Sequence, residues 1–253
     1  RQGGPQRPSA AKRNALEARR RQQRVRATIA VLIVLAIAGA GIGVVTSRSS
    51  SSTSAGGTPE LKLGSLASLG TLQPTGSPGP AGPEGVPVPQ APVLADTGSI
   101  ASGQTVDGIQ CQVSEQVVFH IHVHVTVFLN GAQRQIPYGI GIPGARAQNT
   151  RQGPFVNGGT CLYWLHTHAP DGIIHVESPV QRTYTLGDFF DIWGQPLGPS
   201  QVGPSTGVVT VLYNGRPYEG NPRNIPLKAH AQIQVEVGTP LTAPVSVGFP
   251  NGL

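Results

Sequence analysis

Histidines carry the strongest chemical signal in the chain, because six of the seven lie between residues 120 and 175 in two groups. The first group is His120, His122 and His124 in the sequence FHIHVHV. On a β-strand, residues i, i+2 and i+4 share one face, so the pattern predicts that these three rings project together. Neighbouring positions on that face are about 6.6–6.8 Å apart. Two of the rings can therefore converge on one ion, while the third serves another site or supports the first.

The second group lies in the sequence LHTHAPDGIIHVE, where a turn sequence separates two short apolar segments. If residues 169–172 form the loop of a hairpin, His166 lies opposite His175, and His168 lies opposite position 173. Residues directly opposite each other point to the same face, with Cβ atoms about 4.5–5.5 Å apart. His166, His168 and His175 are therefore expected to form a compact triangle, with a carboxylate one step further along the same face.

Three neutral imidazoles with an open position form a known type of zinc site, and imidazole also suits copper, nickel and iron. The alternative for each group is polar surface without a ligand. Protonated imidazoles at this spacing would repel one another, and a bound cation offsets that cost. The predicted metal ligands are His120, His122, His124, His166, His168, His175 and Glu177. His230 begins the last predicted strand and is interpreted as an isolated polar residue.

The donor types favour Cu(II) or Zn(II) over other ions. Nitrogen ligation with a carboxylate fits both, and the Irving–Williams order favours copper where both metals are present. The chain has no Met, which argues against a dedicated copper(I) carrier. Cys111 and Cys161 are predicted to form a disulfide, because an even count in an oxidising compartment favours one. Thiolate ligation is the alternative, but Cys161 lies five residues before His166, an odd spacing for a strand.

Positive charge is concentrated at the start of the chain. Residues 1–26 hold nine of the 18 Lys and Arg residues, and the remainder carries a net negative charge, so we expect no nucleic-acid partner. Residues 27–46 contain no charged residue and match the length of a membrane-spanning helix. The charge asymmetry places 1–26 in the cytoplasm and the rest outside the cell. The alternative is a cleaved signal peptide, but the apolar stretch is longer than a usual signal core.

Composition divides the remainder into a linker and a folded domain. Residues 47–99 are rich in Ser, Gly and Pro, and we expect them to act as a linker without a fold of their own. Residues 100–253 contain all seven histidines and most strand signals. We expect an all-β sandwich or small barrel with one short helix at Leu186–Trp193, capped by Thr185 and Asp188.

Two Asn-Gly pairs, at 130–131 and 214–215, predict β-hairpin turns. Each ends a similar segment, VTVFLNG and VTVLYNG, at an offset of 84 residues. Two related β halves would explain this similarity, and so would two hairpins that happen to share a pattern.

The stretches CLYWLHTHAPDGIIHVESP, TLGDFFDIWG and HIHVHVTVFLNG together resemble an exported, membrane-anchored, His-rich β-domain family of bacteria and archaea that has no established activity. The resemblance covers roughly residues 110–240 and implies a location and a β fold more than a chemistry. The HxH spacing is also similar to that of cupins, but Glu177 follows His168 by nine residues, further than in a cupin. Cupredoxins are similar in size and β content, but their copper site needs a Cys thiolate and usually a Met. No residue roles are transferred from these families.

These observations leave three functions open. The first is a membrane-tethered, extracytoplasmic domain that binds copper or zinc for buffering, sensing or delivery. The second is a metal-dependent hydrolase or oxidase, in which Glu177 or Asp171 acts as general base. The third is a structural or interaction protein of the cell envelope with incidental histidines. The sequence contains no nucleophile elbow, phosphate loop or HExxH motif, so the metal-binding domain is preferred. It identifies neither a catalytic residue nor a protein partner.

Overall fold

The computed structural model describes residues 61–253 of the chain. The expected cytoplasmic tail (1–26), the expected membrane span (27–46) and the first part of the expected linker lie outside these residues. Within 61–253, no helix has both the length and the apolar character that a membrane span requires.

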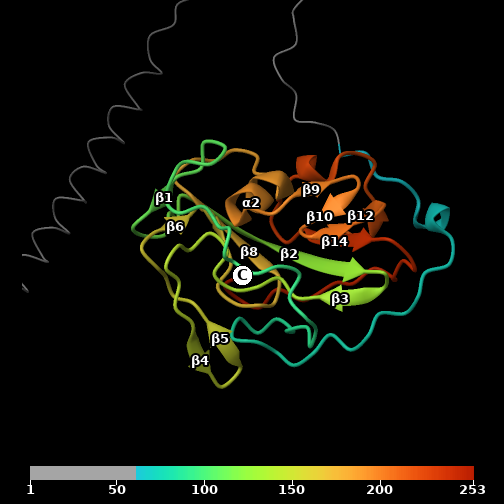
Figure 1. The fold of residues 1–253 in the computed structure, drawn as a ribbon, viewed down its shortest axis with the longest axis horizontal. Coiled ribbons are helices and arrows are strands. Elements are labelled where there is room, and N and C mark those ends of the chain that lie inside the picture. The colour runs from blue at the N-terminus through green and yellow to red at the C-terminus, as the bar shows by residue number, and fades with distance from the viewer. Residues whose placement is uncertain (1–60) are drawn as a thin grey trace, which may run out of the picture. The chain divides into compact units, whose positions relative to one another are not determined.

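Short strands dominate the described chain, and Figure 1 shows them gathered around one central group of arrows. The strands are β1 (Cys111–Gln112), β2 (Phe119–Leu129), β3 (Ala132–Arg134), β4 (Gln148–Thr150), β5 (Gly153–Phe155), β6 (Leu162–Tyr163), β7 (Leu165–His166), β8 (Ile173–Ser178), β9 (Leu197–Gly198), β10 (Gln201–Val202), β11 (Ser205–Thr206), β12 (Val209–Tyr213), β13 (Arg216–Pro217) and β14 (Gln232–Val237). The helices are the 3₁₀ turns η1 (Leu66–Leu69) and η2 (Pro222–Asn224) and the α-helix α2 (Leu186–Trp193).

The largest sheet has seven strands in the order β13-β12-β14-β2-β8-β7, with β3 paired to the end of β2. The β14–β2 pair is parallel and the other pairs are antiparallel. For the described residues, the structure thus confirms the prediction of a mostly-β fold with one short α-helix. The several sheets do not close into the small barrel that was one of the two predicted architectures.

Both predicted Asn-Gly turns are present, and each joins two neighbouring strands of the large sheet. Asn130 and Asn214 have positive φ angles of 51° and 49°, and each is followed by a glycine that also has a positive φ, as a tight hairpin turn requires. The strands before these turns, β2 and β12, both pair with β14, on opposite sides. The two similar segments are therefore hairpin strands of one sheet.

The large sheet buries both of its faces, but with different chemistry. On one face the apolar residues of β2, such as Val123 and Val125, join the main hydrophobic core with the aromatic residues of α2. The other face carries His122, His124 and Thr126, all buried. Because a strand alternates its side chains between two faces, the HIHVHVT pattern produces one apolar and one polar face. The polar face is the unusual one, since buried polar groups need partners.

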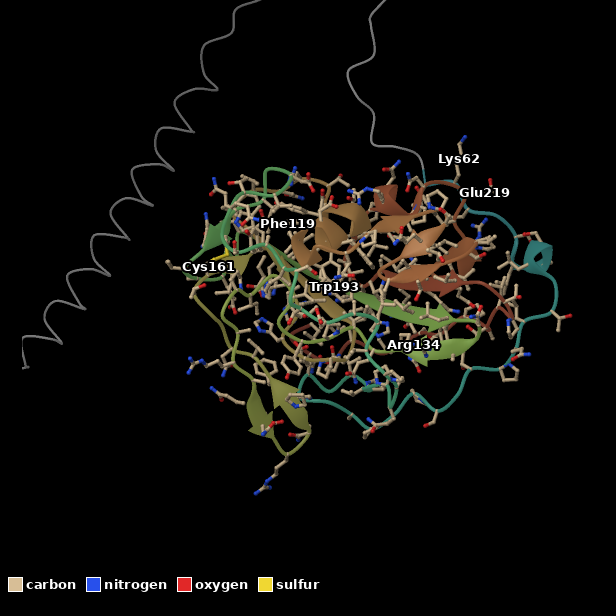
Figure 2. All side chains as sticks on the ribbon, in the orientation of Figure 1. Lys62, Phe119, Arg134, Cys161, Trp193 and Glu219 are labelled. Atoms are coloured by element: carbon tan, nitrogen blue, oxygen red, sulfur yellow. A yellow bond between two sulfur atoms is a disulfide. The ribbon has the colours of Figure 1, made fainter. Side chains whose placement is uncertain are left out.

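Helix α2 covers part of the apolar face and forms as the sequence predicts. The Thr185 side chain accepts a hydrogen bond from the backbone of Asp188, and the Asp188 side chain accepts one from the backbone of Thr185. Gly194 ends the helix in the left-handed conformation. Trp193 is fully buried at the helix end (Figure 2), and its indole donates a hydrogen bond to the backbone carbonyl of Asp96.

Residues 61–99 differ from the expectation of an unstructured linker, because they pack on the β domain. Val86 is fully buried and Leu94 is 5% exposed. The Leu94 amide donates to the carbonyl of Gln135 at 2.9 Å. The amide of Glu219 donates to the carbonyl of Lys62 at 2.9 Å, and Figure 2 shows these two residues side by side. The folded unit therefore begins well before residue 100. Residues between Thr75 and Pro89, together with 244–247, line a hollow over the polar face of β2.

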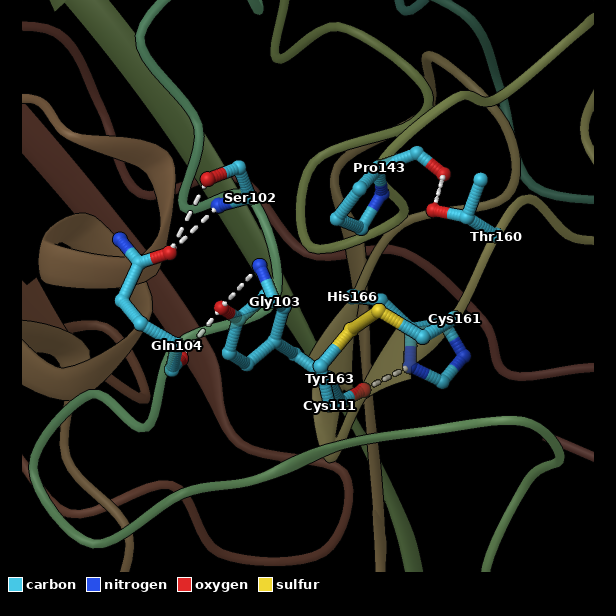
Figure 3. The surroundings of a disulfide bond; sticks show 9 residues. All are labelled: Ser102, Gly103, Gln104, Cys111, Pro143, Thr160, Cys161, Tyr163 and His166. Atoms are coloured by element: carbon cyan, nitrogen blue, oxygen red, sulfur yellow. Dashed lines mark hydrogen bonds between the residues drawn. A yellow bond between two sulfur atoms is a disulfide. The ribbon is translucent and has the colours of Figure 1, made fainter.

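The predicted disulfide between Cys111 and Cys161 is present, with the two Cα atoms 5.5 Å apart. It joins β1 to the residue before β6, and these two strands also pair through hydrogen bonds. Figure 3 shows how close this cross-link lies to the second histidine group, because the ring of His166 contacts the carbonyl of Tyr163 on β6. The disulfide therefore stabilises the strand that orients one of the candidate ligands.

We predict that replacing both cysteines (Cys111→Ser with Cys161→Ser) lowers the free energy of unfolding by about 3–4 kcal/mol, because the bond closes a loop of about 50 residues in the unfolded chain. Urea denaturation of the full chain in mild detergent measures the loss. Reductant should cause the same loss in the wild type and none in the double variant. A loss below about 1 kcal/mol would contradict the prediction.

Candidate metal centre

Three adjacent strands bring histidines from both predicted groups into one row. In the sheet register, His122 on β2 lies opposite His175 on β8, and His166 on β7 lies opposite the same His175 from the other side. One step along, His120 lies opposite Glu177. Opposed residues of neighbouring strands point to the same face. The register alone therefore gathers five of the seven predicted ligands, and the predicted pairing of His166 with His175 is confirmed.

His168 joins this row from just beyond the end of β7, not from a strand position opposite residue 173. The loop of residues 169–172 then turns back into β8. Gly172 in this loop has a φ of 87°, and a Cβ atom there would lie 2.3 Å from the carbonyl oxygen of Val125. Only glycine permits so close an approach, and the Gly172 carbonyl accepts a hydrogen bond from the Val125 amide at 2.9 Å. This contact fixes the loop against β2.

The ring nitrogens of the row lie at distances suited to a shared ion. Nε2 of His122 is 3.1 Å from Nε2 of His120 and 3.1 Å from Nδ1 of His175. Nε2 of His166 is 3.0 Å from Nε2 of His168. Metal–nitrogen bonds of about 2.0–2.1 Å in a tetrahedral site place neighbouring ligand atoms about 3.3 Å apart. The observed spacings need only small adjustments to accept an ion.

Two sets of four residues meet the geometric requirement for a metal site, with all ligand atoms of each set within 4.8 Å of one another. The sets are His120, His122, His175 and Glu177, and His166, His168, His175 and Glu177. The expected triangle of His166, His168 and His175 is present, but Nδ1 of His175 lies in hydrogen-bond range of His122. Within the second set, the shortest distance between ring nitrogens is therefore the one between His166 and His168.

Backbone carbonyls fix the orientation of two rings. Nδ1 of His166 lies 2.8 Å from the carbonyl oxygen of Tyr163, and Nδ1 of His168 lies 2.5 Å from that of Val156. A carbonyl can only accept, so each Nδ1 must carry the hydrogen. In the neutral rings both Nε2 atoms then hold lone pairs, and these face each other at 3.0 Å. Two facing acceptors repel unless a cation lies between them.

Carboxylates border the row and orient a third ring. Nε2 of His175 donates to Glu84 Oε1 at 2.7 Å, so its Nδ1 faces His122. A carboxylate on the outer nitrogen is the usual support of a metal-bound histidine. Glu177 Oε1 lies 3.3 Å from Nε2 of His120 and 3.4 Å from Nδ1 of His175. Glu115 Oε1 lies 3.7 Å from Nε2 of His168 at the exposed rim.

Three of the buried carboxylate oxygens around the row lack a hydrogen-bond partner among the described residues: Glu84 Oε2, Asp171 Oδ2 and Glu177 Oε2. Glu236, another buried carboxylate of the large sheet, gives the contrast. Its oxygens accept hydrogen bonds from Gln234 and from the backbone and side chain of Thr242. Unpartnered buried oxygens are costly. Burial and the neighbouring Glu84 raise the pKa of Asp171 to about 8, so a proton shared between these two acids offsets their cost. For Glu177 Oε2 a cation is the partner that would offset it.

Burial also sets the charge of the rings. It lowers the pKa of His122 to about 3, with further lowering by His175 and His120. Burial, then the neighbouring His168 and His175, hold the pKa of His166 well below its usual value. Burial alone would lower the pKa of His175, but its contacts with Glu177 and Glu84 outweigh it and raise this pKa to about 9. His122 and His166 are therefore neutral at pH 7, as metal ligands must be, whereas His175 is protonated and would release its Nδ1 proton when an ion binds.

His124 was expected among the ligands, and the structure places it elsewhere. Its Nε2 donates to the carbonyl oxygen of Asp171 at 3.0 Å, and it belongs to neither set of candidate ligands. The spacing along a strand explains this, because three successive positions on one face span too great a distance for one ion. His230 also lies outside both sets, as expected, and its ring stacks on Phe249.

Sequence reasoning missed Glu84 and Glu115. Glu84 lies in the segment that we expected to be a linker, and it contacts the ring of His175, which is 91 residues further along the sequence. One signal could have found it, since Glu84 is the only charged residue between Lys62 and Asp96. Glu115 lies in the loop before β2, and a single exposed acidic residue in a loop gives no sequence pattern from which a metal ligand could be predicted.

Comparisons of the chain with family models, curated proteins and solved structures gave no match. The function is therefore argued from the site alone.

We predict that Glu84→Gln lowers metal affinity by about 10–100-fold, the usual effect of removing the carboxylate that supports a metal-bound histidine. Isothermal titration of the full chain with Zn(II) measures the change. Glu236→Gln is the matched control, because the Glu236 side chain is also shielded from solvent but is bonded to Gln234 and Thr242. The control should lower stability and leave affinity unchanged, and equal affinities for both variants would show that Glu84 has no part in binding.

Proposed function

We propose that the chain is a membrane-tethered, extracytoplasmic metal-binding domain that takes Cu(II) or Zn(II) and serves in metal buffering, sensing or delivery. One observation carries the metal-binding part: the Nε2 atoms of His166 and His168 face each other at 3.0 Å, while backbone carbonyls hold the hydrogens on the opposite nitrogens. This arrangement is preorganised for a cation and unfavourable without one.

The donor atoms support the choice of metal. They are imidazole nitrogens and carboxylate oxygens, a set that fits Zn(II) and Cu(II) and not copper(I). Both cysteines form the disulfide, and the chain has no Met, so soft sulfur ligands do not compete. At equal concentrations the Irving–Williams order favours Cu(II) over Zn(II).

The location rests on the sequence, with support from the disulfide. The apolar segment 27–46 follows nine positive charges, which favours a single span with the β domain outside the cell. Disulfides persist in oxidising compartments, which agrees with this orientation. The resemblance to exported, membrane-anchored, His-rich β domains favours the same placement.

Binding is favoured over catalysis by the positions of the two candidate bases. Glu177 lies among the ring nitrogens, where it is a ligand. Asp171 is 1% exposed, and its Oδ1 accepts a hydrogen bond from the amide of Ile173. Both carboxylates are thus buried, 4% and 1% exposed, whereas a base that acts on a substrate needs access to it. The row reaches solvent at its rim, where the side chains of His120 and Glu115 are 37% and 44% exposed.

We predict that the full chain, purified in mild detergent and dialysed against Zn(II) or Cu(II), retains metal, and that His175→Ala, which removes a ring common to both candidate ligand sets, lowers the amount retained. The control is His124→Ala, which removes a buried histidine of the same sheet face that lies outside both ligand sets. Elemental analysis measures the metal, and circular dichroism checks the fold of each variant.

Retained metal with no ester hydrolysis or oxidase activity supports a binding domain. Turnover that disappears in His175→Ala would instead support the metal-dependent enzyme. Negligible metal in the folded wild type would overturn both and leave the structural or interaction protein.

A further inference from the structure

The candidate ligands separate into two close groups around one shared carboxylate. Nε2 of His122 lies 3.1 Å from both Nε2 of His120 and Nδ1 of His175. The second group is the His166–His168 pair, whose Nε2 atoms are 3.0 Å apart. Glu177 reaches both groups, at 3.3 Å from His120 and 4.0 Å from His166.

The number of donors exceeds what one ion takes. Five imidazoles and Glu177 offer six ligand atoms, whereas Zn(II) in protein sites usually takes four. Each group is also oriented by its own support. Glu84 fixes the ring of His175, and the carbonyls of Tyr163 and Val156 fix the rings of His166 and His168. Because the rings of both groups are held in fixed orientations, both groups are suited to bind an ion.

The carboxylates around the row also favour bound cations. Three carboxylates, Glu84, Glu115 and Glu177, lie within 4.0 Å of the ring nitrogens, and among the described residues their ion pairs involve histidines only. One divalent ion would leave this region with excess negative charge. Two such ions supply four positive charges against these three carboxylates and leave a net charge of +1, so the charge favours bound cations while the number of ions rests on the donor geometry.

We propose that the site is dinuclear, with Glu177 bridging two ions. The first ion takes His120, His122, His175 and Glu177 Oε1. The second takes His166 and His168 together with Glu177, whose Oε1 lies 4.0 Å from Nε2 of His166 and whose Oε2 has no hydrogen-bond partner among the described residues. Glu115 at the rim, with Oε1 3.7 Å from Nε2 of His168, completes the second ion. Carboxylate-bridged ions lie about 3.5–4 Å apart in known two-metal sites. This inference rests on the proposed metal-binding function and extends it to the number of ions.

The test is a copper titration of the full chain, with metal content measured after removal of unbound ion. We expect two Cu(II) per chain in the wild type and in the control His124→Ala. His120→Ala and His166→Ala are each expected to keep one ion, because each disrupts only one group. Glu115→Gln, at an exposed position that tolerates substitution, is expected to weaken the second ion about tenfold while the first is unchanged.

Electron paramagnetic resonance gives an independent readout that a purely structural role would not move. Bridged Cu(II) ions couple, so the wild type should show less signal per copper than His120→Ala or His166→Ala. One ion per chain, lost in both of these variants and giving full signal per copper, would overturn the dinuclear site and leave the proposed metal binding intact. No retained copper in any folded variant would overturn both.

Discussion

The structure depends on how it buries the polar face of its largest sheet. Imidazoles and carboxylates taken out of water must find partners, and on this face the partners are supplied unevenly. Glu236 is fully bonded to Gln234 and Thr242. Around the histidine row, lone pairs face lone pairs, and three buried carboxylate oxygens lack a partner among the described residues. In one part of the sheet face every buried carboxylate oxygen is thus hydrogen-bonded, while in the other part some buried acceptors have no partner among the described residues.

Strand register converts this chemistry into a site. Because His175 lies opposite both His122 and His166, β8 acts as the centre of the row, and a slip of one residue would turn its ring to the apolar face. The apolar core with α2 opposes such a slip from the other face. The disulfide contributes at the edge, since it stabilises the strand whose Tyr163 carbonyl orients His166 (Figure 3).

Local patterns predicted those parts of the structure that depend on neighbours in sequence. The helix with its capping box, both Asn-Gly turns, the disulfide and the opposition of His166 and His175 all follow from short-range rules. The pairing of β2 with β8 does not, because it joins residues about 53 apart and no local signal sets its register. The role of Glu84 was hidden for a related reason. Segment 61–99 has the composition of a linker, and it is ordered by contacts with residues distant in sequence, such as Gln135, Trp193 and Glu219.

Segment 61–99 explains why metal binding and folding should be linked in this chain. Glu84 contacts His175 from a segment held by scattered hydrogen bonds and a few buried residues such as Val86. An ion bound by His175 would strengthen the Glu84 contact, because a metal-bound imidazole is a stronger donor. It would also remove the repulsion among the facing nitrogens, which weakens the metal-free fold. A ligand stabilises whichever state binds it. The bound ion would therefore stabilise the packing of segment 61–99 on the histidine row, and release of the ion would weaken that packing.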